Sequence, residues 1–322
     1  MKKYLMVVAV IFFATKTYSQ CCSAGGAIGG SSNVGTVDKK NLRVTAFYRH
    51  SISEDYYRSS KIEVPVGVFL EKAYFNYFGS TFAYGITNRL TAELELGYFL
   101  NKTQVYNKSD LSNVSGSGLS NGVVSVKYNL IHNLANNIDY TAGLGVKFPF
   151  PINIKDNLKG YSIDVLPSTG TFGAVAHSFL SKKFPSINFR ILLVNRFEYN
   201  TENNSDYNTS SNMGYQFGKT LTSSLFLTKM IVKNLTGIIQ LRHEYRTNDK
   251  NKYGNIEVNT GGILYIISPS ISYTIFKTWN LSVAYDRPIY RSYNGKQFAN
   301  KYSITGSVSK QFSLKKKEVK PS

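Results

Sequence analysis

Long apolar runs are missing from this chain beyond its first residues. No later stretch is long and apolar enough to span a membrane as a helix, and the mean hydropathy is −0.20. Acidic residues are also scarce, with 19 Asp and Glu against 38 Lys and Arg and a formal charge of +19. The basic residues are scattered singly along the chain, so we exclude nucleic acid as a partner and favour an anionic membrane surface or anionic solutes.

Motifs typical of enzymes and cofactor-binding proteins are few. We expect no Gly-x-Ser-x-Gly nucleophile elbow, no phosphate-binding loop and no His-Glu-x-x-His metal motif. None of its four histidines forms a His-x-Ser pair on an expected strand. We therefore predict no enzyme activity and no cofactor, and keep a lipid-modifying enzyme that uses His243 as a remote alternative.

The N-terminus predicts export from the cytoplasm. Residues 1–3 are basic, residues 4–14 are apolar, and small residues before Gln20 offer a cleavage site. We therefore expect residues 1–19 to be a signal peptide. Residues 20–40 are rich in Gly and Ser and should be flexible, either hanging in the periplasm or entering the rest of the protein as a plug.

The mature sequence is dominated by segments with an apolar residue at every second position. In residues 90–100, for example, Leu94 and Leu96 alternate with Glu93 and Glu95. Such a pattern gives each strand one face for lipid and one for a polar interior. The expected strands are residues 41–50, 72–87, 90–100, 122–130, 139–148, 169–180, 187–199, 214–227, 236–246, 263–275, 279–289 and 301–312.

Short and long connections take turns between these strands. Together they predict an all-β protein, a single antiparallel transmembrane β-barrel of about twelve strands over residues 41–312. Short turns should face the periplasm and long loops, including residues 291–300, the outside. A basic tail, residues 313–322, follows the barrel.

Aromatic residues that point outward fall near both ends of the expected strands. This placement is typical of the two aromatic girdles that mark the edges of the membrane. Tyr48, Tyr74, Tyr98, Phe148, Tyr199, Tyr215, Tyr245 and Tyr302 form one group, and Tyr84, Tyr128, Tyr140, Phe189, Tyr273 and Trp279 form the other.

The opposite, inward faces carry nine basic and six acidic residues. They could line a solute path with a weak preference for anions. They could equally form a network of salt bridges that fills a narrow barrel. The predicted lumen-lining residues are Arg43, Arg49, Glu93, Glu95, Lys127, Asp139, Lys147, Arg190, Arg196, Glu198, Arg242, Glu244, Arg246, Asp286 and Lys301.

Cys21 and Cys22 are the only cysteines, adjacent and near the expected mature N-terminus. Two thiolates suit a soft metal ion, which makes the pair a candidate metal site. Lipidation of Cys21 is a second possibility, although Tyr18 and Gln20 fit that signal poorly. A pair without function is the third, and the one we favour.

The last expected strand, residues 302–312, alternates and ends on Phe312. It resembles the C-terminal signal that the barrel assembly machinery reads, which makes that machinery an expected partner. Lys310 falls on the outward face, where its long side chain can reach the membrane surface.

Three short motifs carry a family resemblance. Residues 122–130 read GVVSVKYNL, residues 144–149 read LGVKFP, and residues 288–297 contain PIYR and NGKQ. The chain resembles the outer-membrane transporter-type barrels grouped as the MetA-pathway of phenol degradation proteins, distant relatives of the long-chain fatty-acid channel. The resemblance covers about residues 72–312 and implies a channel for small, hydrophobic molecules. The export signal is similar to those of Bacteroidetes proteins.

The sequence therefore predicts a protein of the bacterial outer membrane, surrounded by lipid and lipopolysaccharide. Its expected function is passive uptake or efflux of a small hydrophobic or anionic molecule. The alternative is a surface barrel that carries nothing and binds a partner through its long loops.

Overall fold

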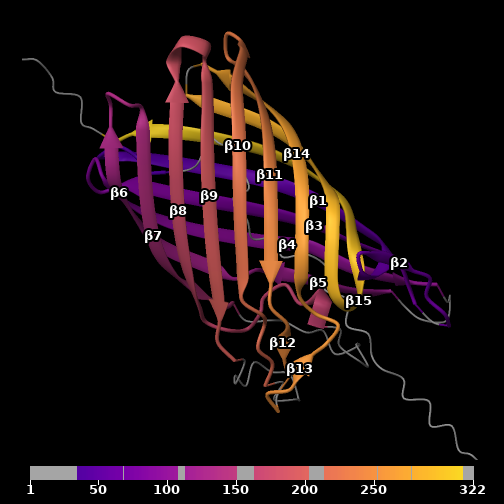
Figure 1. Ribbon diagram of the computed structural model, residues 1–322. Helices are drawn as coiled ribbons and strands as arrows, with labels where there is room; N and C mark the ends of the chain where they lie inside the picture. Colours follow the sequence, from indigo (N-terminus) through magenta and orange to yellow (C-terminus); the bar gives the residue numbers. More distant parts are fainter. Residues whose placement is uncertain are drawn as a thin grey trace, which may run out of the picture.

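The computed structural model describes residues 35–67, 69–107, 113–150, 163–202, 214–251, 253–276 and 278–314, and within them the chain is mainly strand (Figure 1). The strands are β1 (Asn41–Ser59), β2 (Lys61–Glu63), β3 (Leu70–Gly85), β4 (Leu90–Tyr106), β5 (Val114–Leu119), β6 (Gly122–Asn133), β7 (Ile138–Phe148), β8 (Gly173–Phe184), β9 (Phe189–Asn200), β10 (Thr220–Val232), β11 (Leu235–Arg246), β12 (Asp249–Lys250), β13 (Ile256–Glu257), β14 (Gly262–Ile275) and β15 (Trp279–Ser313). Two single helical turns, η2 (Ile163–Val165) and η3 (Pro185–Ile187), interrupt them. No helix in these ranges is long and apolar enough to cross a membrane.

One antiparallel sheet closes on itself to form the barrel (Figure 1). Its order is β15-β14-β11-β10-β9-β8-β7-β6-β4-β3-β1, and β1 pairs with β15 to complete the ring. Closure leaves no long edge strand unpaired, which is the condition for a sheet in lipid. This confirms the all-β, single transmembrane barrel expected from the alternating sequence.

The strand β15 supplies two passes of the wall. Residues 279–293 pair with β14, whereas residues 293–313 pair antiparallel with β1. Because directions alternate from β1 to β14, the chain must reverse inside β15, and it does so near Gly295, which has a φ of 68°. The eleven strands of the ring therefore make twelve passes, and residues 291–300 form a tight hairpin where we expected a long loop.

The short turns and both ends of the barrel sequence lie at the same end of the cylinder. Asn41 of β1 pairs with Ser313 of β15. On the other side of β1, Leu42 pairs with Tyr84, which lies beside the first short turn. Several of these turns place asparagine in the left-handed conformation, which its short polar side chain tolerates better than most residues. They are Asn137, Asn188 and Asn234, with φ values of 53°, 49° and 70°.

Burial along the strands follows the predicted alternation. On β7, Leu144 is 73% exposed, whereas Thr141 and Lys147 are buried. The exposed positions of the wall are rich in Leu, Ile, Val and aromatic residues, and the buried ones in Ser, Thr and charged residues. A soluble protein would hide the apolar face, so this inversion shows a barrel made to be surrounded by lipid.

The outward aromatic residues form rows across neighbouring strands. Tyr48 on β1 is level with Phe78 on β3, which is level with Tyr98 on β4, and all three rings are exposed. At the opposite end, Lys310 places its ammonium group 4.5 Å from the centre of the Trp279 ring. These contacts are those of side chains at a membrane boundary.

Two expected strands begin later than the sequence pattern indicates. The segment predicted over residues 169–180 is β8, which starts at Gly173, and the one predicted over 214–227 is β10, which starts at Thr220. Tyr215, expected on the lipid face, is buried instead, and its hydroxyl donates to Asp249 Oδ2 at 2.5 Å. The alternation of apolar residues could not predict the burial of Tyr215, because its hydroxyl bonds to Asp249 in β12, farther along the chain.

Residues ahead of β1 lie against the inner wall at the end with the short turns. Val37 is buried, and its backbone N–H donates to the Thr91 hydroxyl at 2.8 Å. Thr91 is fully buried on the inner face of β4, and Arg43 Nη2 lies 3.4 Å from the Gly35 carbonyl. The chain therefore enters β1 from inside the barrel mouth. Cys21, Cys22 and the other residues before Gly35 lie outside the described residues.

Candidate functional site

The charged residues predicted to face the lumen are mostly buried in the barrel. Arg43, Arg49, Glu93, Lys127, Lys147, Arg196, Arg242 and Asp286 are buried, whereas Glu95, Asp139, Arg190, Glu198, Glu244, Arg246 and Lys301 are partly exposed. Most of their side chains form ion pairs, some along one strand and others between strands.

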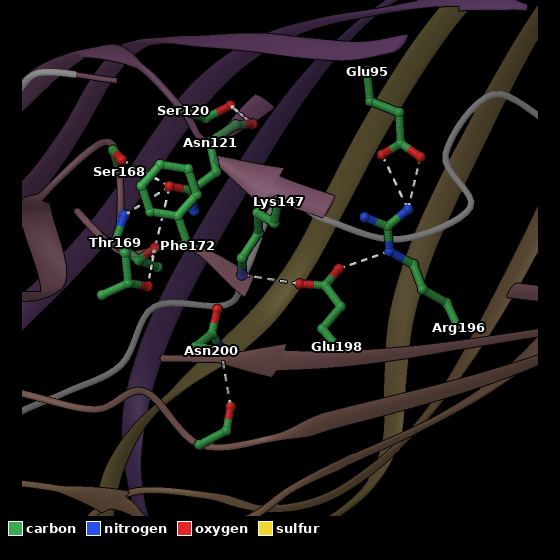
Figure 2. Close-up of polar contacts among 12 residues, drawn as sticks. Glu95, Ser120, Asn121, Lys147, Ser168, Thr169, Phe172, Arg196, Glu198 and Asn200 are labelled. Atoms are coloured by element: carbon green, nitrogen blue, oxygen red, sulfur yellow. Dashed lines mark hydrogen bonds and ion pairs between the residues drawn. The ribbon is translucent and has the colours of Figure 1, made fainter. Parts of the chain in front are cut away.

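One chain of ion pairs, which we call the Glu95 assembly, joins Glu95, Lys147, Arg196 and Glu198 (Figure 2). Arg196 Nη1 donates to both carboxylate oxygens of Glu95, at 2.8 and 3.0 Å. Arg196 Nε donates to Glu198 Oε1 at 2.6 Å, and Lys147 Nζ donates to Glu198 Oε2 at 3.3 Å. Two positive and two negative charges therefore balance within one connected group.

The Glu95 assembly crosses the interior of the barrel. Glu95 belongs to β4 and Arg196 to β9, and the strands β6, β7 and β8 lie between them in the sheet. Side chains on adjacent strands meet along the wall, but strands so far apart can meet only through the lumen. At this level the lumen is bridged by a guanidinium and a carboxylate.

A second group, the Asp286 assembly, contains Arg49, Arg242, Glu244, Ser268 and Asp286. Asp286 Oδ2 accepts from Arg49 Nη2 at 3.0 Å and from Arg242 Nη2 at 2.9 Å. The Ser268 hydroxyl donates to its other oxygen, and Arg242 Nε lies 2.8 Å from Glu244 Oε1. These residues come from β1, β11, β14 and β15, which follow one another in the sheet. The assembly therefore connects neighbouring parts of the wall rather than opposite sides of the lumen.

Two further ion pairs involve predicted lumen-lining residues. Lys127 pairs with Glu93 on the neighbouring strand, and its ammonium group lies 4.9 Å from the centre of the Phe179 ring. Arg246 Nη2 lies 2.8 Å from Asp249 Oδ1. Many of the charged residues predicted to face the lumen are therefore joined in ion pairs.

Lys301 differs from the position that the sequence predicted. Its side chain is 44% exposed and pairs with Glu54, while the adjacent Asn300 is buried and donates to the Ser51 hydroxyl at 2.6 Å. A bulge causes this, because Ser51 pairs with Ser303 but Ser53 pairs with Asn300. The extra residue, Lys301, is displaced from the inner face.

Near the end with the long loops, a segment of the connection between β7 and β8 folds against the inner wall. Val165 and Leu166 are buried, and a Cβ atom at Gly116 of β5 would lie 2.1 Å from the Val165 carbonyl oxygen. Asn121 Oδ1 accepts hydrogen bonds from Ser168 and Thr169 and holds the end of the segment (Figure 2). This part of the connection narrows the barrel mouth, a feature that the sequence pattern did not predict.

Asp249 organises a second structure at the same end. It is fully buried and accepts hydrogen bonds from Tyr215 Oη and from the Gly218 N–H, the latter at 2.7 Å. Its own N–H donates to the Thr260 hydroxyl at 2.8 Å. Burial, and then the Asp249 charge, raise the pKa of Tyr215, so its hydroxyl stays protonated and donating.

The expectation that the chain has no Gly-x-Ser-x-Gly pattern is wrong, because residues 118–122 read GLSNG. In nucleophile elbows this pattern joins a strand to a helix. Here it joins β5 to β6, and both strands pair with β4. Leu119 pairs with Tyr98 and Val123 with Glu95, so this segment has one residue more than the facing part of β4, which is a bulge in the wall. This spacing gives no support to an enzyme.

Comparisons with known proteins identify the architecture. No family model and no curated protein match the chain. An outer membrane channel from Pseudomonas putida F1 matches 88% of this chain and 99% of its own length, with a TM-score of 0.70 and 13% identity. The chain has the fold of an outer-membrane β-barrel. Two porins also match: NanC covers 84% of the chain and 98% of its own (TM-score 0.46, 14% identity), and KdgM 83% and 99% (0.42, 10%).

Proposed function

We propose that this protein is a passive channel of the bacterial outer membrane for small solutes. The proposal rests mainly on one observation, a closed barrel with an apolar outer face and a polar, charged inner face. The first face suits lipid and the second suits a hydrated path. The shared fold with an outer membrane channel supports the proposal at the level of architecture.

The structure favours a narrow path over a wide pore. A barrel of twelve strands is intermediate between the filled eight-stranded barrels and the open porins. The Glu95 assembly bridges this interior, and residues near Val165 and Asn121 narrow one mouth. We therefore expect a small solute. The sequence resemblance adds a small hydrophobic compound as a candidate, and the buried arginines add a small anion.

Reconstitution in planar lipid bilayers tests the proposal. The refolded protein should show discrete conductance steps in potassium chloride, smaller than those of a sixteen-stranded porin. A folded barrel, recognised by its faster gel mobility before heating, with no conductance in any salt would refute it.

An interaction barrel is the second candidate, favoured by the ordered structure around Asp249. The bonds of Asp249 to Tyr215, Gly218 and Arg246 fix parts of two long connections on each other. Such a surface could bind a partner outside the cell. If conductance is absent and trimming residues 253–258 abolishes attachment of a phage or protein to cells, this candidate replaces the channel.

A further inference from the structure

We propose that the Glu95–Arg196 ion pair is a latch across the lumen, and that a solute carboxylate opens it by replacing Glu95 on the Arg196 guanidinium. The inference rests on the proposed channel function and adds a solute class, small carboxylates, and the residue that recognises them.

The latch can open without damage to the wall. Glu95 and Arg196 stand on β4 and β9, which share no backbone ladder. Separating the two side chains therefore breaks no strand pairing. It removes a bridge from the lumen while the sheet stays closed.

Arg196 has a second anchor that holds it in place when Glu95 leaves. Glu198, two residues along β9, accepts from Arg196 Nε at 2.6 Å, and Lys147 holds the other oxygen of Glu198. The described hydrogen bonds of the Glu95 carboxylate both go to Arg196. Glu95 is thus the partner that can move, and Arg196 is the fixed receptor.

Exposure and geometry favour exchange at the same point. The Glu95 side chain is 27% exposed, against 9% for Arg196 and 13% for Glu198. Both oxygens of Glu95 accept from the same nitrogen, Nη1, whereas a carboxylate binds guanidinium best through two parallel bonds to two nitrogens. A solute carboxylate, free of the constraint of a strand, can adopt the better geometry.

Single-channel recording of the full-length protein tests the latch, with sodium acetate as the probe and sodium chloride of equal ionic strength as the reference. We expect acetate to raise the open probability of the wild type at least twofold. Glu95→Ala should already be at least twofold more open in chloride and should not respond further to acetate.

The matched control is Glu244→Ala. The Glu244 side chain is also 27% exposed and also pairs with an arginine, but that arginine, Arg242, lies on the same strand. This variant removes an equal charge without opening a bridge, so its conductance and acetate response should equal those of the wild type. Faster gel mobility before heating checks that every variant is folded.

The outcomes separate the latch from the channel. Wild-type conductance that Glu95→Ala leaves unchanged, or that Glu244→Ala raises equally, overturns the latch and leaves the channel standing. An acetate response that persists in Glu95→Ala overturns the exchange. If the folded wild type and Glu95→Ala are both silent, the channel and the latch are both wrong.

Discussion

The Glu95 and Asp286 assemblies contain similar groups but connect the barrel differently. The Asp286 carboxylate is 7% exposed and accepts from two buried arginines on β1 and β11. The Glu95 carboxylate is about a quarter exposed and reaches one arginine across the lumen. Asp286 is a buried hub, and its loss leaves buried arginines without a partner and so destabilises the wall. The Glu95–Arg196 pair is partly hydrated, so breaking it costs little free energy. We infer that the first assembly serves stability and the second serves passage.

Removal of the hub should have the largest effect on stability. Asp286→Ala leaves Arg49 and Arg242 buried without their shared carboxylate, and breaking such a pair costs about 3–5 kcal/mol. Urea unfolding in lipid vesicles, followed by gel mobility, measures the loss. Asp286→Asn, which keeps hydrogen-bonding oxygen, should lose less. A loss below about 1 kcal/mol for Asp286→Ala would mean that the hub does not hold the wall.

The Lys127–Glu93 pair should come second. Both side chains are buried, but in Glu93→Ala the Lys127 ammonium keeps its contact with the Phe179 ring. We therefore expect a smaller loss, about 2–3 kcal/mol, in the same unfolding experiment. Adding Phe179→Leu should increase the cost of losing Glu93. Independent, additive losses would show that the ring does not support the lysine.

Glu95→Ala should cost the barrel little. Arg196 keeps Glu198, and the lost carboxylate is partly exposed, so we expect about 1 kcal/mol or less. This variant should combine near-wild-type unfolding with altered conductance, the reverse of Asp286→Ala. Unfolding as severe as that of Asp286→Ala would erase the distinction between the two assemblies.

The smallest effect should come from an ion pair outside the barrel wall. Arg58, near the end of β1, forms a hydrogen bond with Glu63 on β2. This bond holds the pKa of Glu63 below its usual value, and Lys296 lowers that pKa further. Stabilisation by the pair is therefore present above the usual pKa of glutamate and is lost as the pH falls through the lowered pKa. Because the Arg58 side chain is exposed, Glu63→Gln should leave urea unfolding at pH 7 unchanged, and a clear shift would contradict this.

Much of the wall could be predicted from local pattern. The strand expected at residues 90–100 lies within β4, and its alternation of Leu94 with Glu93 correctly indicates which residues are buried. Alternation works here because lipid on one side and a polar interior on the other act on every second residue. The pattern did not predict where β10 starts or that Lys301 lies in a bulge, because each feature depends on a partner far away in the sequence.

The contacts inside the barrel could not be predicted in the same way. Glu95 and Arg196 are 101 residues apart, and their meeting depends on how the sheet closes. The inward faces indicated which charges share the interior, but the pattern contained nothing that assigned Glu95 to Arg196 or Asp286 to two arginines. Pairing is a property of the closed cylinder and its register.

The junction of β1 with the end of β15 also constrains the order of events in the cell. The hydroxyls of Thr45 and Ser309 lie 3.1 Å apart although 264 residues separate them in sequence. The first strand to be synthesised must therefore wait for the last one. Until then its hydrogen-bonding edge stays open and prone to wrong pairings, so the nascent chain needs protection during its passage through the periplasm.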